Sequence, residues 1–332
     1  MSVSMIPPVT ASDFLTRAGW SGAEILPLAG DASFRRYFRV VLQDRHAVLM
    51  DAPPPHEDPR PFISVAEWLV GQGFAAPRIF ASDLELGLVL IEDFGGNRMR
   101  EVLDADPRLE RPLYRDVVTL LTELATKPAM AIDHYSLSEY QRELGLFTEW
   151  YCPAVGADVD AAEYVTLWND LLEPVIAAQA HPVTVLRDYH AENIMLIEGR
   201  EQLDRLGLLD FQDALAGHPA YDLVSMLQDA RRTVSPEIEA DMLAHYCSLA
   251  NPGDGFDAAY HILGVQRNLK ILGIFTRLWK RDGKPRYRAF QPRVWGYVER
   301  GLRHPALALA RAWMDANVPV EKRAAAWVEF AE

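Results

Sequence analysis

The pattern of apolar residues changes at Gly95-Gly96, and this change constrains the fold more than any other feature of the chain. Before it, short apolar runs alternate with turn residues, which is typical of strands. After it, apolar residues recur mainly at the spacing of helices. Two successive glycines also form a flexible joint. The sequence of 332 residues therefore predicts two lobes, 1–95 and 96–332, each long enough to have its own core.

The predicted elements differ between the two lobes and indicate an α+β fold. In the first lobe the order is three strands, a helix and two more strands. These elements are expected at 24–28, 37–42, 47–51, 61–71, 78–81 and 86–91. In the second lobe a strand hairpin at 193–210 interrupts a series of helices. The helices are expected at 109–126, 137–150, 161–179, 237–248 and 257–280, with three more toward the end of the chain.

Composition excludes several classes of protein. The net charge of −14 argues against binding to nucleic acid, which requires an excess of cations. No apolar run reaches the roughly 18 residues of a membrane helix, and the first residues do not have the pattern of a secretory signal. Cys152 and Cys247 are too few for a disulfide framework or a zinc site. We expect a cytoplasmic monomer with no membrane or nucleic-acid partner.

The predicted hairpin brings polar side chains to one edge of its two strands. Asn193 begins the first strand and Asp210 ends the second, so antiparallel pairing places them side by side. Asp188 lies five residues before Asn193, in the loop that enters the hairpin. Mg²⁺ prefers carboxylate and amide oxygens and takes its other ligands from water and substrate phosphates. The spacing therefore predicts a magnesium site made by Asn193 and Asp210.

With the ion held by the other two residues, Asp188 is available for catalysis. A loop Asp, an Asn five residues later and a further Asp on the metal form an arrangement used for phosphoryl transfer. In that arrangement the loop Asp accepts the proton of the attacking hydroxyl. Turn propensity alone also explains such residues, but the trio after a strand-rich lobe favours phosphoryl transfer with Asp188 as the catalytic residue.

Two segments carry a resemblance to a known superfamily. LRDYHAENIML (186–196) and GLLDFQDALAGHPAYDL (207–223) resemble the aminoglycoside phosphotransferases and choline kinases, whose two-lobe fold is protein-kinase-like. The resemblance runs from about residue 25 to about residue 225 and places Leu186 where the family has His. It implies that Asp188 is catalytic, that Asn193 and Asp210 bind Mg²⁺, and that Asp222 braces the catalytic loop.

The resemblance also implies an ATP site in the first lobe. The segment 88–96 is similar to the family's hinge, where backbone groups near Glu92 would bind adenine. The segment 28–40 stands where a glycine-rich loop covers the phosphates but contains one glycine only. A tight turn could still present backbone N–H groups to the phosphates. That turn would be made by Gly30, Asp31, Ala32 and Ser33.

The third predicted strand departs from the family pattern. Met50 stands where the family has a Lys or Arg for the nucleotide phosphates, and Glu67 would be the usual partner of that cation. Arg35 and Arg36 are the nearest cations in the sequence. Strand alternation should send one of them inward and the other outward, and the sequence leaves open which one.

The helical lobe is similar to one branch of the superfamily, the bacterial anomeric kinases of cell-wall amino sugars. This resemblance implies phosphorylation of the C1 hydroxyl of N-acetylmuramate and N-acetylglucosamine in peptidoglycan recycling. A sugar site needs aromatic faces and hydrogen-bonding side chains, and the lactyl carboxylate of N-acetylmuramate needs a cation such as Arg277, Lys270 or Arg281. The candidate sugar contacts are Glu149, Trp150, Tyr151, Tyr189, His190, Glu192, Asn268 and Arg277.

Two alternatives remain. One is a kinase for aminoglycosides or other small metabolites, whose cationic acceptor would suit the acidic net charge. The segment 267–288 is instead rich in Arg and Lys, which favours a neutral or anionic sugar. The other is a non-catalytic pseudokinase, for which Met50 is the best argument. The intact Asp188, Asn193 and Asp210 argue against it.

Overall fold

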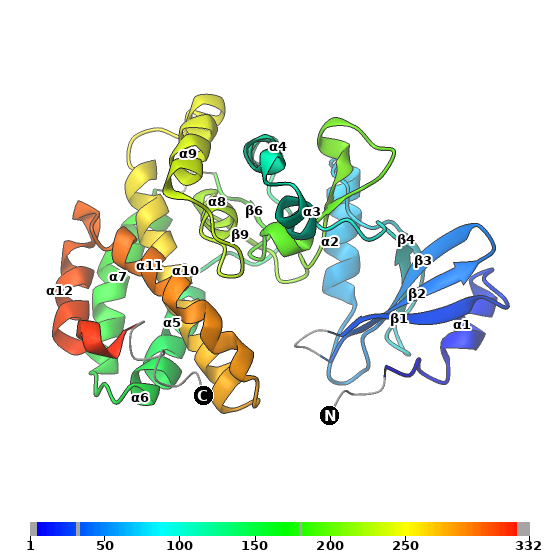
Figure 1. Ribbon diagram of the computed structural model, residues 1–332, viewed down its shortest axis with the longest axis horizontal. Coiled ribbons are helices and arrows are strands. Elements are labelled where there is room, and N and C mark those ends of the chain that lie inside the picture. Colours follow the sequence, from blue (N-terminus) through cyan, green and yellow to red (C-terminus); the bar gives the residue numbers. More distant parts are fainter. Residues whose placement is uncertain (1–4, 31–33, 179–180, 324–332) are drawn as a thin grey trace. The chain divides into compact units, whose positions relative to one another are not determined.

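The computed structural model describes residues 5–30, 34–178 and 181–323, and the chain divides into two units (Figure 1). The first unit contains residues 1–109 and 192–214. The second contains residues 110–191 and 215–332. This division differs from the predicted boundary near residue 95, since the hairpin segment belongs to the first unit.

A five-stranded antiparallel sheet forms the first unit's centre, in the order β1-β2-β3-β5-β4. The predicted order of three strands, a helix and two strands is confirmed, with α2 as the helix. Helix α1 was not predicted; its Phe14 and Leu15 join Trp20 in the core on one side of the sheet. The elements are α1 (Ala11–Arg17), β1 (Glu24–Gly30), β2 (Arg36–Leu42), β3 (Arg45–Asp51), α2 (Arg60–Gly71), β4 (Ile79–Asp83) and β5 (Leu88–Glu92).

The hairpin consists of β7 (Ile194–Leu196) and β8 (Leu206–Leu208), which are shorter than predicted. It belongs to the first unit because its backbone is bonded there. The N–H of Leu196 donates to the carbonyl of Asn97 at 2.7 Å, and the N–H of Leu208 donates to that of Ala75 at 2.7 Å. Helix α3 (Met99–Ala105) lies beside β7. The link between β7 and β8 carries a short 3-10 turn, Gln202–Arg205.

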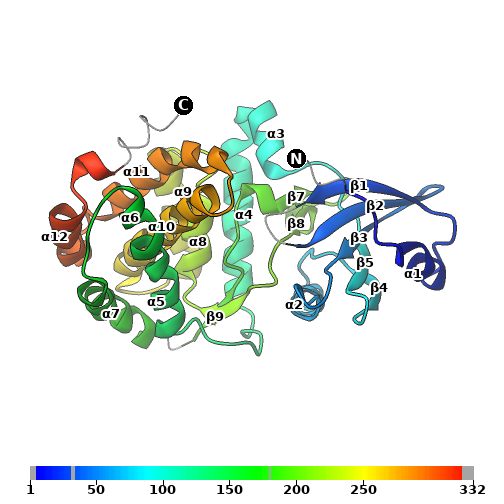
Figure 2. The same ribbon diagram turned by 90° about the horizontal axis from the view of Figure 1, so that it is seen from below.

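Helix α10 (Phe256–Lys280) is the centre of the second unit and packs against α5, α8 and α11 (Figure 2). The five helices predicted between residues 109 and 280 are confirmed, whereas α8 and the short pair β6-β9 were not predicted. The elements are α4 (Glu110–Ala125), α5 (Leu137–Leu146), a π-helical turn (Phe147–Tyr151), α6 (Cys152–Ala154), α7 (Ala161–Ala177), β6 (Val183–Val185), β9 (Leu215–Gly217), α8 (Ala220–Leu227), α9 (Pro236–Ala250), α11 (Gln291–Gly301) and α12 (Ala308–Asn317).

Beyond Lys280 three helices were predicted. Within the described residues up to 323, the chain forms α11 and α12 together with single 3-10 turns. These turns are Pro285–Phe290, Pro305–Leu307 and Val320–Lys322.

A glycine allows α10 to approach α5 closely. A Cβ at Gly273 would lie 2.4 Å from the backbone C and O atoms of Leu146. Replacing Gly273 by Ala is therefore expected to lower the free energy of unfolding by about 2 kcal/mol or more, because the helices must separate. Gly296→Ala in α11 is the matched control, since its Cβ would meet nothing within 4 Å. It should raise stability by about 0.5–1 kcal/mol. Urea titrations compare the two; a neutral effect at Gly273 would contradict the packing.

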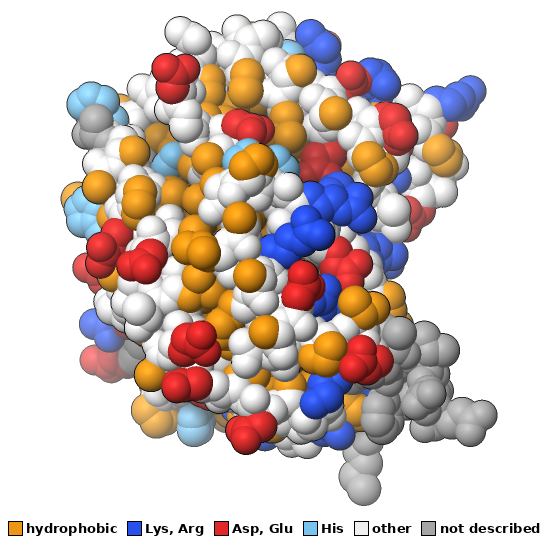
Figure 3. Space-filling view, turned by 90° about the vertical axis from the view of Figure 1, so that its left-hand side faces the viewer, with side chains coloured by type: hydrophobic (Ala, Val, Ile, Leu, Met, Phe, Trp, Pro, Cys, Tyr) orange, Lys and Arg blue, Asp and Glu red, His pale blue; other side chains and the backbone are white. Residues whose placement is uncertain are grey.

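Within the described residues, no helix combines the length and the apolar content that a bilayer span requires. On the face of the second unit that carries α12, acidic side chains are spread over the surface, and Lys and Arg occur in several places with their largest group at the centre right of the view (Figure 3).

Candidate active site

Asn193 and Asp210 lie together at one end of the hairpin in the first unit. The amide Nδ2 of Asn193 is 3.4 Å from Oδ2 of Asp210, and the amide of Gln212 donates to Oδ1 at 2.9 Å. The backbone N–H of Leu209 donates to the carbonyl of Asn193 at 3.0 Å, which extends the ladder by one bond. The predicted proximity is therefore observed.

These two residues fit a magnesium ion chemically. A carboxylate and an amide supply the hard oxygen ligands that Mg²⁺ accepts. Asp210 has a φ of +59°, a left-handed conformation that Asp adopts more readily than most residues. The ring of Phe211, the residue after Asp210, stacks on Phe62 of α2 with 5.1 Å between the ring centroids. Their role as metal ligands stays a prediction.

Arg35 and Arg36 have different partners, which resolves what strand alternation left open. Arg36 forms an ion pair with the buried carboxylate of Asp51 at 2.5 Å, directly across the β2-β3 ladder. Arg35 lies 3.5 Å from Glu57, and only 11% of its side chain is exposed. Burial acts to lower the pKa of Arg35, but Tyr37, Asp210, Glu57 and Asp213 outweigh it and raise the pKa. Arg35 is thus the cation near Asp210.

The other predicted nucleotide contacts are less closely grouped. Met50 is fully buried, and Glu67 is exposed on α2. The ion pair described for Arg35 is with Glu57 and not with Glu67. The side chain of Glu92 at the end of β5 pairs with Arg78 at 3.0 Å and Arg200 at 2.6 Å. Gly30 ends β1, whereas Asp31, Ala32 and Ser33 lie outside the described residues. These nucleotide contacts stay predictions.

Asp188 belongs to the second unit, and its convergence with Asn193 and Asp210 stays a prediction. Its loop is held by Asp222 of α8, which accepts the N–H of Leu186 at 2.6 Å and that of Arg187 at 2.8 Å. This geometry matches the bracing role that the resemblance implied. Burial raises the pKa of Asp222 to about 7, and the two backbone N–H bonds and Arg267 act in the opposite direction.

The carboxylate of Asp188, the predicted catalytic residue, lies near several cationic side chains. Its side chain is 46% exposed, and an Nη of Arg267 is 4.0 Å from Oδ1. Burial acts to raise the pKa of Asp188, but the charge of Lys270 and then those of His190, Arg267 and Arg187 outweigh it and lower the pKa. Asp188 is therefore ionised at neutral pH and is a weak base.

Three predicted sugar contacts lie in the core instead. Tyr151 is fully buried, and its hydroxyl donates to the carbonyl of Lys322 at 2.8 Å. The Tyr189 hydroxyl donates to the carbonyl of Val117 at 2.8 Å. Asn268 is fully buried and donates to Gln228 at 2.7 Å. Their burial and bonds favour structural roles, because a sugar needs accessible groups.

The remaining candidates are more accessible or lie near Asp188. Glu149 is exposed and Trp150 is half-buried on the π-helical turn, and Arg277 is half-buried on α10. His190 is buried, and its Nε2 is 3.3 Å from an Nη of Arg231. Glu192 belongs to the first unit and forms an ion pair with Arg100. π-helical turns are frequent at functional sites. No sequence pattern indicated this one.

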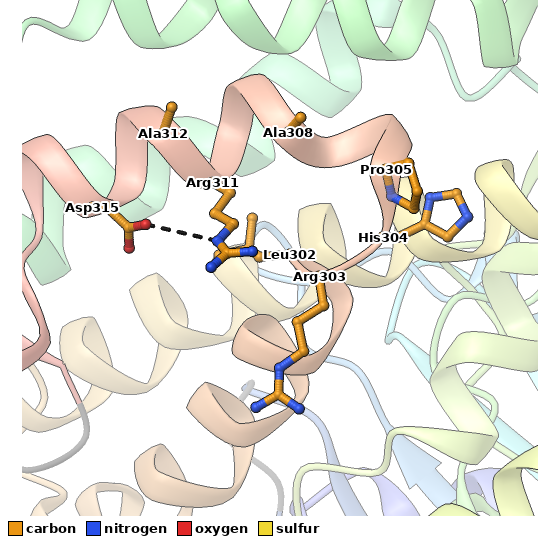
Figure 4. Close-up of a pocket in the computed structure, with 8 residues that line it drawn as sticks. All are labelled: Leu302, Arg303, His304, Pro305, Ala308, Arg311, Ala312 and Asp315. Atoms are coloured by element: carbon orange, nitrogen blue, oxygen red, sulfur yellow. Dashed lines mark ion pairs between the residues drawn. The ribbon is translucent and has the colours of Figure 1, made fainter.

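A cluster of Asp257, His261 and His304 has ligand atoms within 4.8 Å of one another, but its hydrogen bonds indicate a structural role. Nδ1 of His304 accepts the N–H of Ala306 at 3.2 Å, and Nε2 is 2.9 Å from Asp257. A metal on Nε2 would require a proton on Nδ1 and would break the first bond. His304 also borders a depression of about 380 Å³ beside α12, which its neighbours and the Arg311–Asp315 pair line (Figure 4).

Residues 24–260 match the sequence model of a family described as "Phosphotransferase enzyme family". The chain belongs to the phosphotransferase enzyme family. Membership makes the protein an enzyme of the kinase type and implies the use of ATP.

Proteins with curated names resemble the chain over most of its length. An N-acetylmuramate/N-acetylglucosamine kinase from Caulobacter vibrioides is 35% identical, over 97% of this chain and 100% of that protein. A protein of the same name from Pseudomonas aeruginosa is 38% identical, over 87% of this chain and 88% of that protein.

The fold is also that of solved structures. A choline/ethanolamine kinase family protein from Mesorhizobium loti has a TM-score of 0.61 at 14% identity, covering 92% of this chain and 97% of that one. The predicted α+β fold with a strand-rich first part and a helical second part is confirmed.

Proposed function

We propose that the protein transfers the γ-phosphoryl group of ATP, with Mg²⁺, to the C1 hydroxyl of N-acetylmuramate and N-acetylglucosamine. The product would be the sugar 1-phosphate, which places the enzyme in peptidoglycan recycling. The observation that carries this proposal is the shared name of the curated relatives, one of which aligns over its entire length.

The surroundings of Asp188 support an anomeric acceptor. Four cationic or ring groups lower the pKa of Asp188 against the effect of burial, so the carboxylate is a weak base. A weak base limits the rate of proton removal least when the hydroxyl is acidic. The anomeric hydroxyl of a sugar is more acidic than an ordinary alcohol. The larger contribution of Asp188 is then to orient the attacking oxygen in line with the phosphoryl group.

We propose the following roles for the other residues. Asn193 and Asp210 would hold Mg²⁺, which neutralises charge on the phosphates when bound. Arg35 would neutralise the phosphates in place of the cation missing at Met50. Glu149, Trp150, His190 and Arg277 stay proposed sugar contacts. We also propose that residues 1–95 bind the nucleotide, that residues 96–332 bind the sugar, and that the enzyme acts in the cytoplasm as a monomer.

The assignment of Arg35 has a matched test. Arg35→Met should lower kcat/KM for ATP by about 100-fold, because a phosphate contact to a charged group is lost. Arg36→Met removes the neighbouring cation, whose partner is Asp51. It should stay within about threefold of wild type in kcat/KM, with a lower melting temperature. Steady-state kinetics with varied ATP measure both; equal losses in the two variants would contradict the assignment.

The acceptor is tested by ADP release with defined sugars. Turnover is expected with N-acetylmuramate and N-acetylglucosamine and not with their methyl glycosides, which lack a free C1 hydroxyl. Kanamycin and choline are the controls for other acceptors of this fold. Turnover of a methyl glycoside at the rate of the free sugar would contradict an anomeric kinase.

A further inference from the structure

The second unit contains a buried carboxylate that no part of the proposed reaction uses. Glu143 of α5 is fully buried and forms ion pairs with two cations, Lys270 at 2.6 Å and Arg187. It also accepts the hydroxyl of Tyr135 at 2.5 Å and the amide of Gln266 at 3.1 Å. These bonds outweigh its burial and lower the pKa of Glu143 to about 2. Its charge is therefore permanent at any working pH.

The cations that Glu143 binds are the neighbours of the catalytic residue. Arg187 precedes Asp188 in the chain, and its backbone has a φ of +70°. Lys270 exerts the largest cationic effect on Asp188, ahead of His190, Arg267 and Arg187. Arg267 donates a hydrogen bond to the hydroxyl of Ser225 at 2.6 Å, and its guanidinium lies 4.0 Å from Asp188. Lys270 and Arg187 thus have two carboxylates within reach of their charge, Glu143 and Asp188.

We propose that Glu143 is a positioning residue that keeps the carboxylate of Asp188 available to the acceptor, by binding the two cations that would otherwise pair with it. The proposal rests on the proposed role of Asp188. A loop carboxylate that paired closely with Lys270 and Arg187, in addition to Arg267, would be a poorer acceptor for the hydroxyl and its proton. Glu143 keeps Lys270 and Arg187 in ion pairs with α5, so that they do not pair closely with Asp188.

The substitution Glu143→Gln removes the charge and keeps the shape. Lys270 then loses its described carboxylate partner and Arg187 loses one of its carboxylate partners, which is costly unless they find another anion. Asp188 is a carboxylate on which the charges of both already act, so they should turn toward it. Removing one cation as well should relieve the competition, because Arg187 retains Glu139 at 3.4 Å. The double variant E143Q/K270M is therefore expected to be more active than E143Q alone.

A matched control exists in α9. Glu239 is also buried and accepts an arginine, Arg300, together with the hydroxyl of Tyr260 and the amide of Gln228, each at 2.9 Å. Glu239→Gln removes the same kind of charge from the same kind of network. None of these partners belongs to the catalytic loop, so this variant reports the cost of a broken buried ion pair by itself.

The experiment measures kcat, KM and melting temperature for E143Q, K270M, E143Q/K270M and E239Q with ATP and N-acetylglucosamine. E143Q should lower kcat by about 30-fold or more, part of what a positioned proton acceptor contributes, while KM for ATP changes by less than about threefold. E143Q/K270M should regain at least about tenfold of that loss. E239Q should lose melting temperature and keep kcat within about threefold.

Several results would overturn the proposal. A loss of kcat in E143Q no larger than in E239Q would make Glu143 a structural residue. A double variant as slow as E143Q, or slower, would show that Lys270 does not compete for Asp188. If E143Q alone does not fold, the comparison of E143Q/K270M with K270M decides, since equal kcat is expected and a further loss contradicts it. Wild-type enzyme without turnover, or full turnover in Asp188→Asn, would instead refute the proposed function and this inference with it.

Discussion

Replacement of Asp188 by Asn is expected to lower kcat by about 1,000-fold or more and to leave ATP binding within about threefold of wild type. Asn has nearly the same shape, and the loop that carries it is held by the two backbone bonds to Asp222. The loss would therefore come from the missing charge, which orients the acceptor hydroxyl and takes its proton. Initial rates of ADP release give kcat, and calorimetry gives the dissociation constant of ATP.

The pH dependence gives an independent check on the same residue. The carboxylate is the active form of Asp188, and its pKa lies below the ordinary value. Acidification from neutral pH should therefore not reduce kcat through Asp188 until the pH falls below the ordinary range of an aspartate. An acidic limb near neutral pH that disappears in Asp188→Asn would contradict this, because the group would then have a raised pKa.

The second large effect is expected at the proposed metal site. Asp210→Asn should lower kcat by about 1,000-fold or more at ordinary magnesium concentrations, because the charged ligand is lost. Asn tolerates the left-handed φ of +59° at this position, so the backbone should be preserved. Melting temperature is measured together with kcat in order to separate lost chemistry from lost folding.

Asp213→Asn is the matched control for this variant. Asp213 is exposed, lies three residues further along the chain and also acts on Arg35. It should retain kcat within about fivefold of wild type. Chelation of divalent metal by EDTA should stop turnover in the wild type, and added Mg²⁺ should restore it. Turnover that survives in Asp210→Asn would remove Asp210 from the reaction.

Local sequence patterns predicted the parts of the site that depend on short stretches of chain. Asn193 and Asp210 flank a hairpin, and antiparallel pairing alone brings hairpin ends together. Local pattern could not decide between Arg35 and Arg36. Alternation along a strand predicts that their side chains point to opposite faces, but it does not predict which one points inward. The ion pair of Arg36 with Asp51 joins two neighbouring strands, and only the register of β2 on β3 fixes it.

Long-range contacts explain most of what the sequence did not reveal. The hairpin belongs to the first unit through bonds such as that from Leu196 to Asn97, across about a hundred residues of chain. Helix α8 was missed because the helix that begins after Pro219 has only eight residues, too few for a clear helical period. Glu143 resembles an exposed charge, yet it lies between Tyr140 and Phe147 at helical spacing on the buried face, and that spacing was the available signal.

The position of the phosphate on the product distinguishes phosphorylation of the anomeric hydroxyl from phosphorylation of any other hydroxyl of the sugar. The enzyme would be incubated with ATP, Mg²⁺ and N-acetylglucosamine, and the product examined by phosphorus NMR with coupling to the sugar protons. One new phosphomonoester signal coupled to the proton on C1 is expected. A signal coupled to the protons on C6, or to no proton of the sugar, would contradict it.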